Sequence, residues 1–372
     1  MKLRALSGGE ASITPFLNTL AVETWDTWFR WRADGQLRDI TIDDTWERVA
    51  TALAAGTARS TDYKRRLIEA FAAWRLLLDE RVIATAGTDA AQWNSDNLRA
   101  VLNAASFVRA PGSRRATFDF ACFENSAVLA MQALEGAVGL VDDNSGSDAR
   151  TRVGLIGLGD ALALLNVAYD SDDGRMQAAN IARALARGCL AGSIALAREH
   201  GARIRCDAAW SERASHRGYP RGLIEDALRH GLHQREFTAI TSQPRLSSFA
   251  NGVADALDPL PDACCDPADS YAAALGRRAR GCANAAASAS DVPTCVAAQL
   301  RMRATVQPWI DERIDYPFNI DRAPSAAEIG AWSALARELD LGPLSWRFRQ
   351  RGTHEAVATV LSPQGSTWAG AG

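Results

Sequence analysis

The sequence contains almost no lysine: of its 41 basic residues, only Lys2 and Lys64 are lysines, and all others are arginines. Schiff-base or P-loop chemistry would need one of these two, and Lys64 stands between Tyr63 and Arg65 in a setting typical of a solvated helix face. A positive surplus is missing as well, because 44 acidic residues give a net charge of −3. These absences argue against both chemistries and against a dedicated nucleic-acid binder.

Long apolar runs are absent too. The most apolar stretch, residues 179–199, is interrupted by Arg183, Arg187 and Arg198, whereas a transmembrane helix needs about 20 consecutive apolar residues. The N-terminus leads from Met1 into glycines and a glutamate rather than into an apolar core, so no signal peptide is expected. We therefore expect no membrane contact and a cytoplasmic location.

The sequence has no Cys-x-x-Cys motif. Its seven cysteines are scattered, at Cys122, Cys189, Cys206, Cys264, Cys265, Cys282 and Cys295. In a cytoplasmic chain this predicts mostly reduced thiols. Cys122 and Cys189 fall in predicted helices, which favours structural burial. A redox pair between one of the adjacent Cys264 and Cys265 and one of the last two cysteines stays open, because neighbouring cysteines rarely bond to each other.

The composition is that of a globular protein, since 47% of the 372 residues are hydrophobic and 23% are charged. The first part is predicted to be helical, over residues 14–32 from Thr14 and Pro15, from Thr41 through Leu53, and over 60–79. Thr41 and Asp44 have the spacing of a capping box. Aromatic side chains recur near helical spacing in these segments and are expected to form a packed core, namely Trp25, Trp28, Phe29 and Trp46.

From residue 97 onward, short apolar segments alternate with helical patterns. The expected elements are a strand within 98–108, helices over 127–141, 170–200 and 306–314, a β-branched segment at 237–241 and a strand over 344–348. Ser325 and Glu328 form a second capping box, opening a helix that ends near Gly342. The pattern predicts a helix-rich α/β fold. We expect an N-terminal helical region at 1–93, an α/β domain at 94–361 with an irregular insertion at 262–292, and a flexible tail at 362–372.

Two motif-like clusters predict packing rather than ligand binding. Gly154, Gly157 and Gly159 are ordered G-x-x-G-x-G instead of the dinucleotide-binding G-x-G-x-x-G, and no clear strand precedes them. We expect them to allow close helix packing. His230 and His233 lie three residues apart on a predicted helix and could face a zinc ion, but no second cluster with metal-site spacing follows. No metal is therefore expected.

Several segments carry a collinear pattern over about 14–350. Residues 102–108 read L-N-A-A-S-F-V, residues 152–160 read R-V-G-L-I-G-L-G-D, and Asp258-Pro259 follows later in the chain. Taken in order, they resemble C-N-L-G-S-I-N-L, R-x-x-G-x-G-x-x-G-L-x-D and E-P of the ribonucleotide reductase catalytic (large) subunit, closest to the adenosylcobalamin-dependent class. The resemblance implies that a partial reductase-like α/β half-barrel follows the helical region.

The resemblance also shows departures from that family. Its finger loop N-P-C-x-E, which supplies the radical cysteine, would lie between Thr88 and Leu102, where this sequence has a short stretch without cysteine. The redox-partner cysteine of C-N-L-G-S is Leu102 here. The phosphate-binding P-T-G-T is replaced by residues 242–245, in which Pro244 has no N–H to donate. These losses imply that the chain does not reduce ribonucleotides.

Three hypotheses follow. The preferred one is a shortened, degenerate homologue, a pseudoenzyme that acts by binding a nucleotide or a protein partner. The second is an enzyme with altered chemistry in the remodelled barrel, and the third is a component of an active ribonucleotide reductase. The candidate site residues are Ser242, Arg245 and Ser247 for an anion, and Asp258, Asp311 and Glu312 for acid–base chemistry.

No cofactor is expected. Adenosylcobalamin would be expected only if the family activity is retained. The expected partners are a nucleotide and either a second copy of the chain or another protein. An open half-barrel leaves strand edges unpaired, which predicts a homo-oligomer or a hetero-complex.

Overall fold

The computed structural model describes residues 16–55, 60–89, 93–95, 97–141, 150–260, 296–320, 323–348 and 358–360. Several sequence-based expectations lie outside these residues. They concern the helix start at Thr14 and Pro15, the insertion at 262–292, the tail at 362–372, and Cys264, Cys265, Cys282 and Cys295.

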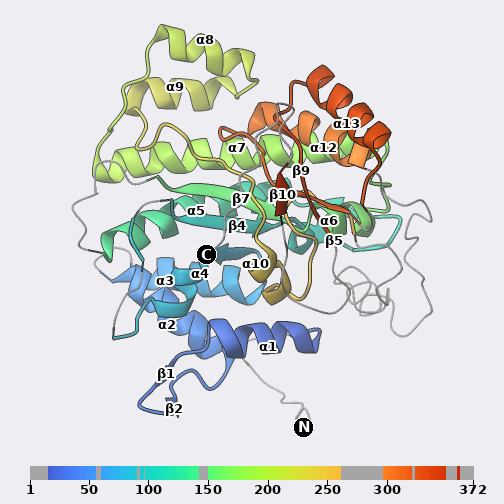
Figure 1. Cartoon of the computed structure of the whole chain (residues 1–372). Coiled ribbons are helices and arrows are strands. Elements are labelled where there is room, and N and C mark those ends of the chain that lie inside the picture. The colour runs from blue at the N-terminus through green and yellow to red at the C-terminus, as the bar shows by residue number, and fades with distance from the viewer. Residues whose placement is uncertain are drawn as a thin grey trace.

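Helices form the N-terminal part of the molecule, which lies at the bottom of Figure 1. Helix α1 (Thr19–Trp28) begins at Asn18, whose side chain accepts a hydrogen bond from the Ala21 N–H. Strands β1 (Arg32–Ala33) and β2 (Gln36–Leu37) form a short hairpin that leads to α2 (Ile42–Ala54). The capping box of Thr41 and Asp44 at the start of α2 is confirmed.

The predicted helix over 60–79 is wrong in its second half. Helix α3 covers Ser60–Ala72, and Trp74 then adopts a positive φ of 55°, which stops the helix. Three successive buried leucines follow as strand β3 (Leu76–Leu78), and α4 (Glu80–Thr85) comes after it. An unbroken apolar run suits a strand that is buried on both faces.

A three-stranded sheet, in the order β3-β4-β7, forms the centre of the molecule. Strand β4 (Arg99–Asn103) lies within the predicted strand region and pairs antiparallel with β3. Strand β7 (Arg152–Ile156) pairs parallel with β4, and Val153 also forms a parallel bridge to Thr238. The described residues form no closed barrel, and the helix-rich α/β fold predicted from the sequence is confirmed.

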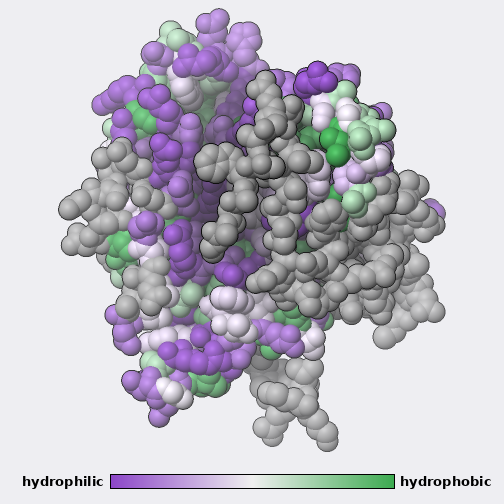
Figure 2. Space-filling model, in the orientation of Figure 1, coloured by the Kyte–Doolittle hydropathy of each residue, from purple (hydrophilic) through white to green (hydrophobic). Residues whose placement is uncertain are grey.

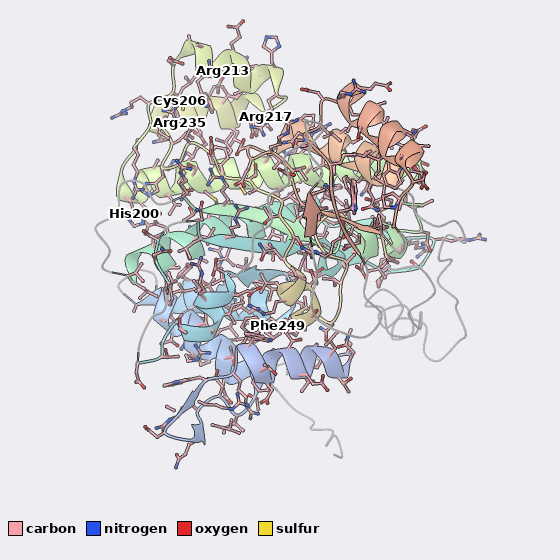
Figure 3. The ribbon with its side chains drawn as sticks, viewed as in Figure 1. His200, Cys206, Arg213, Arg217, Arg235 and Phe249 are labelled. Atoms are coloured by element: carbon pink, nitrogen blue, oxygen red, sulfur yellow. The ribbon has the colours of Figure 1, made fainter. Side chains whose placement is uncertain are left out.

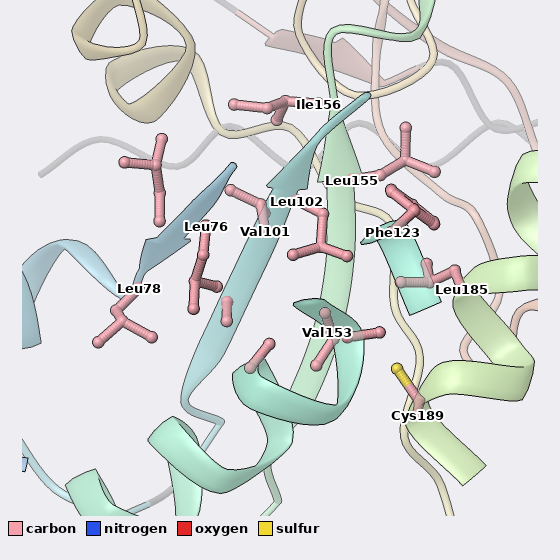
Figure 4. Packing of buried hydrophobic residues seen from close by; sticks show 14 of the residues in the cluster. Leu76, Leu78, Val101, Leu102, Phe123, Val153, Leu155, Ile156, Leu185 and Cys189 are labelled. Atoms are coloured by element: carbon pink, nitrogen blue, oxygen red, sulfur yellow. The ribbon is translucent and has the colours of Figure 1, made fainter. Parts of the chain in front are cut away.

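Two long helices pack on this sheet. Helix α5 (Phe120–Gly139) runs along α7 (Asp172–His200), and both contact β7. Figure 4 shows Phe123 of α5 and Leu185 of α7 on the side of the sheet where Leu155 lies, with Cys189 further along α7. The helix predicted at 127–141 starts earlier than expected, at Phe120. It begins there because the carboxylate of the preceding Asp119 accepts a hydrogen bond from Cys122 N–H. The helix predicted at 170–200 is confirmed.

Short elements complete the part of the chain before residue 261. Strands β5 (Val108–Arg109) and β6 (Thr117–Phe118) form a hairpin before α5. Further short helices are η1 (Ala104–Phe107), α6 (Leu158–Leu164), α8 (Ala208–His216), α9 (Arg221–His230) and α10 (Pro244–Phe249).

A second, smaller hydrophobic cluster lies in the C-terminal part. It is built by α12 (Val296–Val306), α13 (Ala326–Glu338) and the sheet β10-β9-β8, whose strands are Ala358–Val360, Ser345–Phe348 and Phe318–Ile320. The capping box of Ser325 and Glu328 and the strand over 344–348 are confirmed, while α13 ends at Glu338, earlier than the predicted end near Gly342.

The helix predicted over 306–314 is wrong. Helix α12 ends at Val306, a single 3₁₀ turn η3 (Gln307–Trp309) contains Pro308, and Ile310 is extended. Proline disfavours the α conformation in the residue before it and lacks the N–H that would continue the helix. The segment that follows is consequently free to run as a loop against the central sheet.

The aromatic core is confirmed for Trp25, Phe29 and Trp46, which are at most 5% exposed, but it is wrong for Trp28. Trp28 is 53% exposed, and the Arg245 guanidinium lies over its ring at 3.9 Å. Helical spacing brings aromatic residues near one another without fixing which of them faces the core.

Replacing Trp28 by alanine is expected to lower the free energy of unfolding by only about 1 kcal/mol, the size of an exposed cation–π contact. Urea unfolding of the variant measures it. A loss above ~3 kcal/mol, which is typical of a buried aromatic residue, would contradict this exposed position.

On the face shown in Figure 2, hydrophilic side chains predominate over α8 and α9 at the top. Among the described residues, no helix is both long and apolar enough to cross a membrane. Even α7, the longest, is punctuated by arginines along its length.

Candidate functional site

A loop crosses the carboxyl ends of the parallel strands β4 and β7, where barrel-type proteins carry their sites. Residues 253–258 are tied to this end of the sheet: Gly157 N–H donates to Ala254 O at 2.8 Å, and the buried Asp160 carboxylate accepts from Ala254 N–H at 2.6 Å. The loop brings Asp255 and Asp258 to this position.

The three glycines of the G-x-x-G-x-G stretch make this crossing possible. A Cβ on Gly159 would lie 2.6 Å from the Asp258 carbonyl oxygen, and one on Gly154 would lie 2.4 Å from the Ala239 oxygen. Gly157 has a φ of +71°, where a side chain would also strike the Asn103 amide oxygen. The glycines therefore allow close packing, but the expected packing between helices is wrong, because the close contacts are with loops and a strand. The expectation that no strand precedes them is wrong as well, since β7 contains Gly154 and ends just before Gly157.

Asp258 is a buried carboxyl, 7% exposed, and one of the acid–base candidates. Asn319 donates a hydrogen bond to its Oδ2 at 2.6 Å. Burial, and then the nearby Asp255 charge, raise the pKa of Asp258 to about 7, against the opposing effects of Arg303, Asn319 and Tyr316. Such a group exchanges a proton near neutral pH, which is what general acid–base catalysis requires.

The buried Tyr316, the partly buried Tyr169 and an arginine lie around Asp258. Tyr169 donates to Leu257 O at 2.7 Å, and the Tyr316 hydroxyl accepts from Leu257 N–H at 3.0 Å. Burial raises the pKa of both tyrosines, so both stay protonated. Arg303 donates to Tyr316 O at 2.7 Å, and its guanidinium lies over the Tyr316 ring at 3.8 Å.

This Asp258 cluster contains polar atoms without a partner. Asp258 Oδ1, Arg303 Nη2 and Gln299 Oε1 are buried and make no hydrogen bond within the described part of the chain. Leaving a buried polar atom without a partner costs about 1–3 kcal/mol, so three such atoms in one cluster are consistent with a bound water or with a site that acts on a ligand or a proton.

Asp255 binds the turn that the resemblance aligns with the family's phosphate-binding loop. Its Oδ2 accepts from Ser242 Oγ at 2.5 Å, and its Oδ1 accepts from Gln243 N–H at 2.7 Å and from Ser247 Oγ at 3.3 Å. Burial raises the pKa of Asp255, while these three hydrogen bonds oppose the rise. Two anion candidates, Ser242 and Ser247, therefore already bind a carboxylate of their own chain.

Arg245, the third anion candidate, has partners as well. Its guanidinium forms an ion pair with Glu80 at the start of α4 and stacks on Trp28. Burial raises the pKa of Glu80, and the Arg245 charge opposes the rise. The structure does not bring Arg245 to Asp258 through any contact among the described residues.

The remaining acid–base candidates, Asp311 and Glu312, hold segments together. Asp311 Oδ2 accepts from the N–H groups of Phe237 and Thr238 at 2.8 and 3.1 Å, while its Oδ1 accepts from Arg217 at 2.7 Å. Arg217, labelled in Figure 3, caps the C-terminal end of α8. Glu312 accepts two hydrogen bonds from Arg99, at 3.0 and 3.2 Å.

The two histidines do not share a helix face. Helix α9 ends at His230, Gly231 takes a φ of +74°, and His233 lies beyond the helix end, 2% exposed. The prediction of one helix through both is wrong, because the glycine stops it. His233 Nε2 lies 2.9 Å from Glu135 Oε1. In the described ranges, no three His, Cys, Asp or Glu side chains converge as metal ligands.

Three cysteines fall within the described residues. Cys189 is fully buried in α7, as expected, and burial raises the pKa of its thiol. Burial also raises the pKa of Cys206, whereas Cys122 is half-buried in α5. A nucleophilic thiol needs a lowered pKa, so neither Cys189 nor Cys206 has that environment.

The central part of the chain matches a known family. A family model described as ribonucleotide reductase, barrel domain, matches residues 93–243. This stretch is ribonucleotide-reductase-like. The match includes β4, α5, β7 and α7 and ends within the turn that Asp255 binds, and it covers less than half of the chain. No curated protein matches the sequence.

The residues of the Asp258 cluster were only partly predicted from the sequence. Asp258 was selected from its place in the motif order. Asp255 and Arg303 were missed, since neither lies in a motif and each reaches its partners only through the fold.

Proposed function

We propose that this ribonucleotide-reductase-like chain acts by binding and does not itself reduce ribonucleotides. One observation carries the proposal: the Asp255 carboxylate accepts hydrogen bonds from Ser242, Gln243 and Ser247. In the resemblance, these positions correspond to the loop that holds the substrate phosphate. A fixed carboxylate in that place uses the donors and repels a second anion.

The position of Leu102 supports the same proposal. It corresponds to a redox cysteine in the resemblance, yet it is a fully buried leucine of β4, which Figure 4 shows between Val101 and Leu155. A leucine carries no thiol to deliver electrons. The proposed protein binds a nucleotide or a protein partner in the cytoplasm as an oligomer or hetero-complex, with adenosylcobalamin involved only if reductase activity is retained.

A turnover assay tests this proposal. The purified protein, supplied with nucleoside diphosphates or triphosphates, adenosylcobalamin and dithiothreitol, is expected to form no deoxynucleotide above background. The variant in which all seven cysteines are replaced by serine or alanine is expected to bind its ligand as the natural chain does. Cobalamin-dependent turnover that disappears with a single cysteine substitution would contradict the proposal, and Cys264, Cys265 and Cys295 would be examined first.

A second candidate function is acid–base catalysis at the Asp258 cluster. Its support is the pKa of Asp258, about 7, combined with the unpartnered Oδ1 atom beside Tyr316 and Arg303. An enzyme of this kind would lose turnover in Asp258→Asn while remaining folded.

A further inference from the structure

A cavity of about 340 Å³ opens on the outer side of the helices, lined from α3, the β5–β6 hairpin and the N-terminal part of α5. Cavities of about 300–1,000 Å³ are the usual size for small-molecule sites. The lining residues that bear on its chemistry are Arg66, Glu69, Arg75, Arg109, Asp119 and Cys122.

Positive charge exceeds negative charge in this arginine cavity. Asp119 is bound to Arg109, whose Nε donates to its Oδ2 at 2.9 Å, and Glu69 is bound to Arg65 at 2.6 Å. Arg66 and Arg75 form no ion pair within the described part of the chain. Both carboxylates therefore pair with another arginine, and the half-buried guanidinium groups of Arg66 and Arg75 form no salt bridge of their own with a described residue.

One further feature favours an anion here. The Nε of Arg75 is buried without a hydrogen-bond partner among the described residues, although the guanidinium lies over the Phe107 ring at 6.0 Å and near the Asp119 carboxylate. Arginine guanidinium groups that converge from separate elements bind phosphate with several hydrogen bonds at once.

We propose that the arginine cavity binds the phosphate group of a small phosphate monoester, with Arg66 and Arg75 as the main donors. The inference builds on the proposed binding function but places the ligand away from the turn that Asp255 occupies. The two proposals can fail separately. Absence of phosphate binding in the arginine cavity would not change the expected turnover result, and ribonucleotide reduction in the turnover assay would not contradict phosphate binding in this cavity. Cys122 lines the same cavity and is half-buried, which makes it a chemical reporter of occupancy.

Isothermal titration with adenosine monophosphate, inorganic phosphate and adenosine, at matched ionic strength, tests the site. Adenosine monophosphate is expected to bind and adenosine is not. Binding of inorganic phosphate as well would show that the phosphate alone is sufficient. Each of Arg66→Gln and Arg75→Gln is expected to weaken binding at least ~10-fold, because each removes a charge-assisted hydrogen bond. Arg213→Gln, an exposed arginine of α8, is the matched control and is expected to leave affinity unchanged.

Alkylation of Cys122, followed by peptide mass mapping, gives an independent measurement. Bound adenosine monophosphate is expected to slow the modification of Cys122 in the natural chain and in Arg213→Gln, but not in the other two variants. Thermal unfolding of the variants without ligand shows whether they are folded. Equal affinity for adenosine, unchanged affinity in both cavity variants, or no binding at millimolar phosphate monoester would overturn the proposal.

Discussion

Replacing Asp311 by alanine is expected to lower the free energy of unfolding by about 3–5 kcal/mol, the range for breaking a buried, hydrogen-bonded charge pair. The Asp311 side chain is 10% exposed and accepts hydrogen bonds from Phe237 N–H, Thr238 N–H, Thr238 Oγ and Arg217. Its removal leaves two backbone N–H groups without their acceptor and removes one of the two acceptors of the Arg217 guanidinium, whose Nε still donates to Pro308 O. Chemical denaturation with urea measures the loss.

Asp315→Ala is the matched control for this prediction. Asp315 lies four residues further along the same loop and is exposed, so its loss is expected to change stability by less than about 0.5 kcal/mol. Similar small losses in both variants would mean that Asp311 does not fasten the loop after α12 to the central sheet. Asp311 would then again be a candidate for acid–base chemistry.

Local chemistry explains which parts of the fold could be predicted from the sequence. The capping boxes at Thr41 and Ser325 were predicted correctly because each depends on a partner three residues away. Strand β3 was missed because three leucines after a helical pattern are compatible with more helix, and only the positive φ of Trp74 separates the two. Periodicity could not exclude Trp28 from the core, because it lies three residues after the buried Trp25, a spacing that places two residues on the same face of a helix.

The candidate site depends on contacts between distant segments, and this limits what the sequence could predict. Asp258 and Asn319 form a hydrogen bond although they are 61 residues apart in the sequence. Asp255 accepts from Ser242, 13 residues earlier, and α10 lies between the two. The residue types alone suggested acid–base chemistry at Asp258 and Asp311 and anion binding at Ser242. Only the fold shows that Asp255 binds the anion candidates and that Asp311 is fully hydrogen-bonded.

Replacing Asp258 by asparagine is expected to change how stability depends on pH. The pKa of Asp258 is raised from 3.8 to about 7 in the folded chain, so folding takes up a proton between these values. A raised carboxyl pKa means that this group favours the folded state most at low pH, and that its contribution falls as pH rises to about 7 and stays constant above. From pH 5 to pH 8 the natural chain should lose roughly 3 kcal/mol through this one group.

Asp258→Asn removes the titration, so its stability relative to the natural chain should rise by that amount between pH 5 and pH 8. The neutral amide keeps an oxygen to accept from Asn319, and the Oδ1 atom had no described partner to lose. Urea unfolding of both chains at pH 5, 6, 7 and 8 measures the difference, and Asp315→Asn, on an exposed position, is expected to run parallel to the natural chain. Parallel curves for Asp258→Asn would mean that Asp258 is already ionised at pH 5. The Asp258 cluster would then hold a charged carboxylate beside Arg303, which suits a fixed ion pair and not a group that exchanges protons near neutrality.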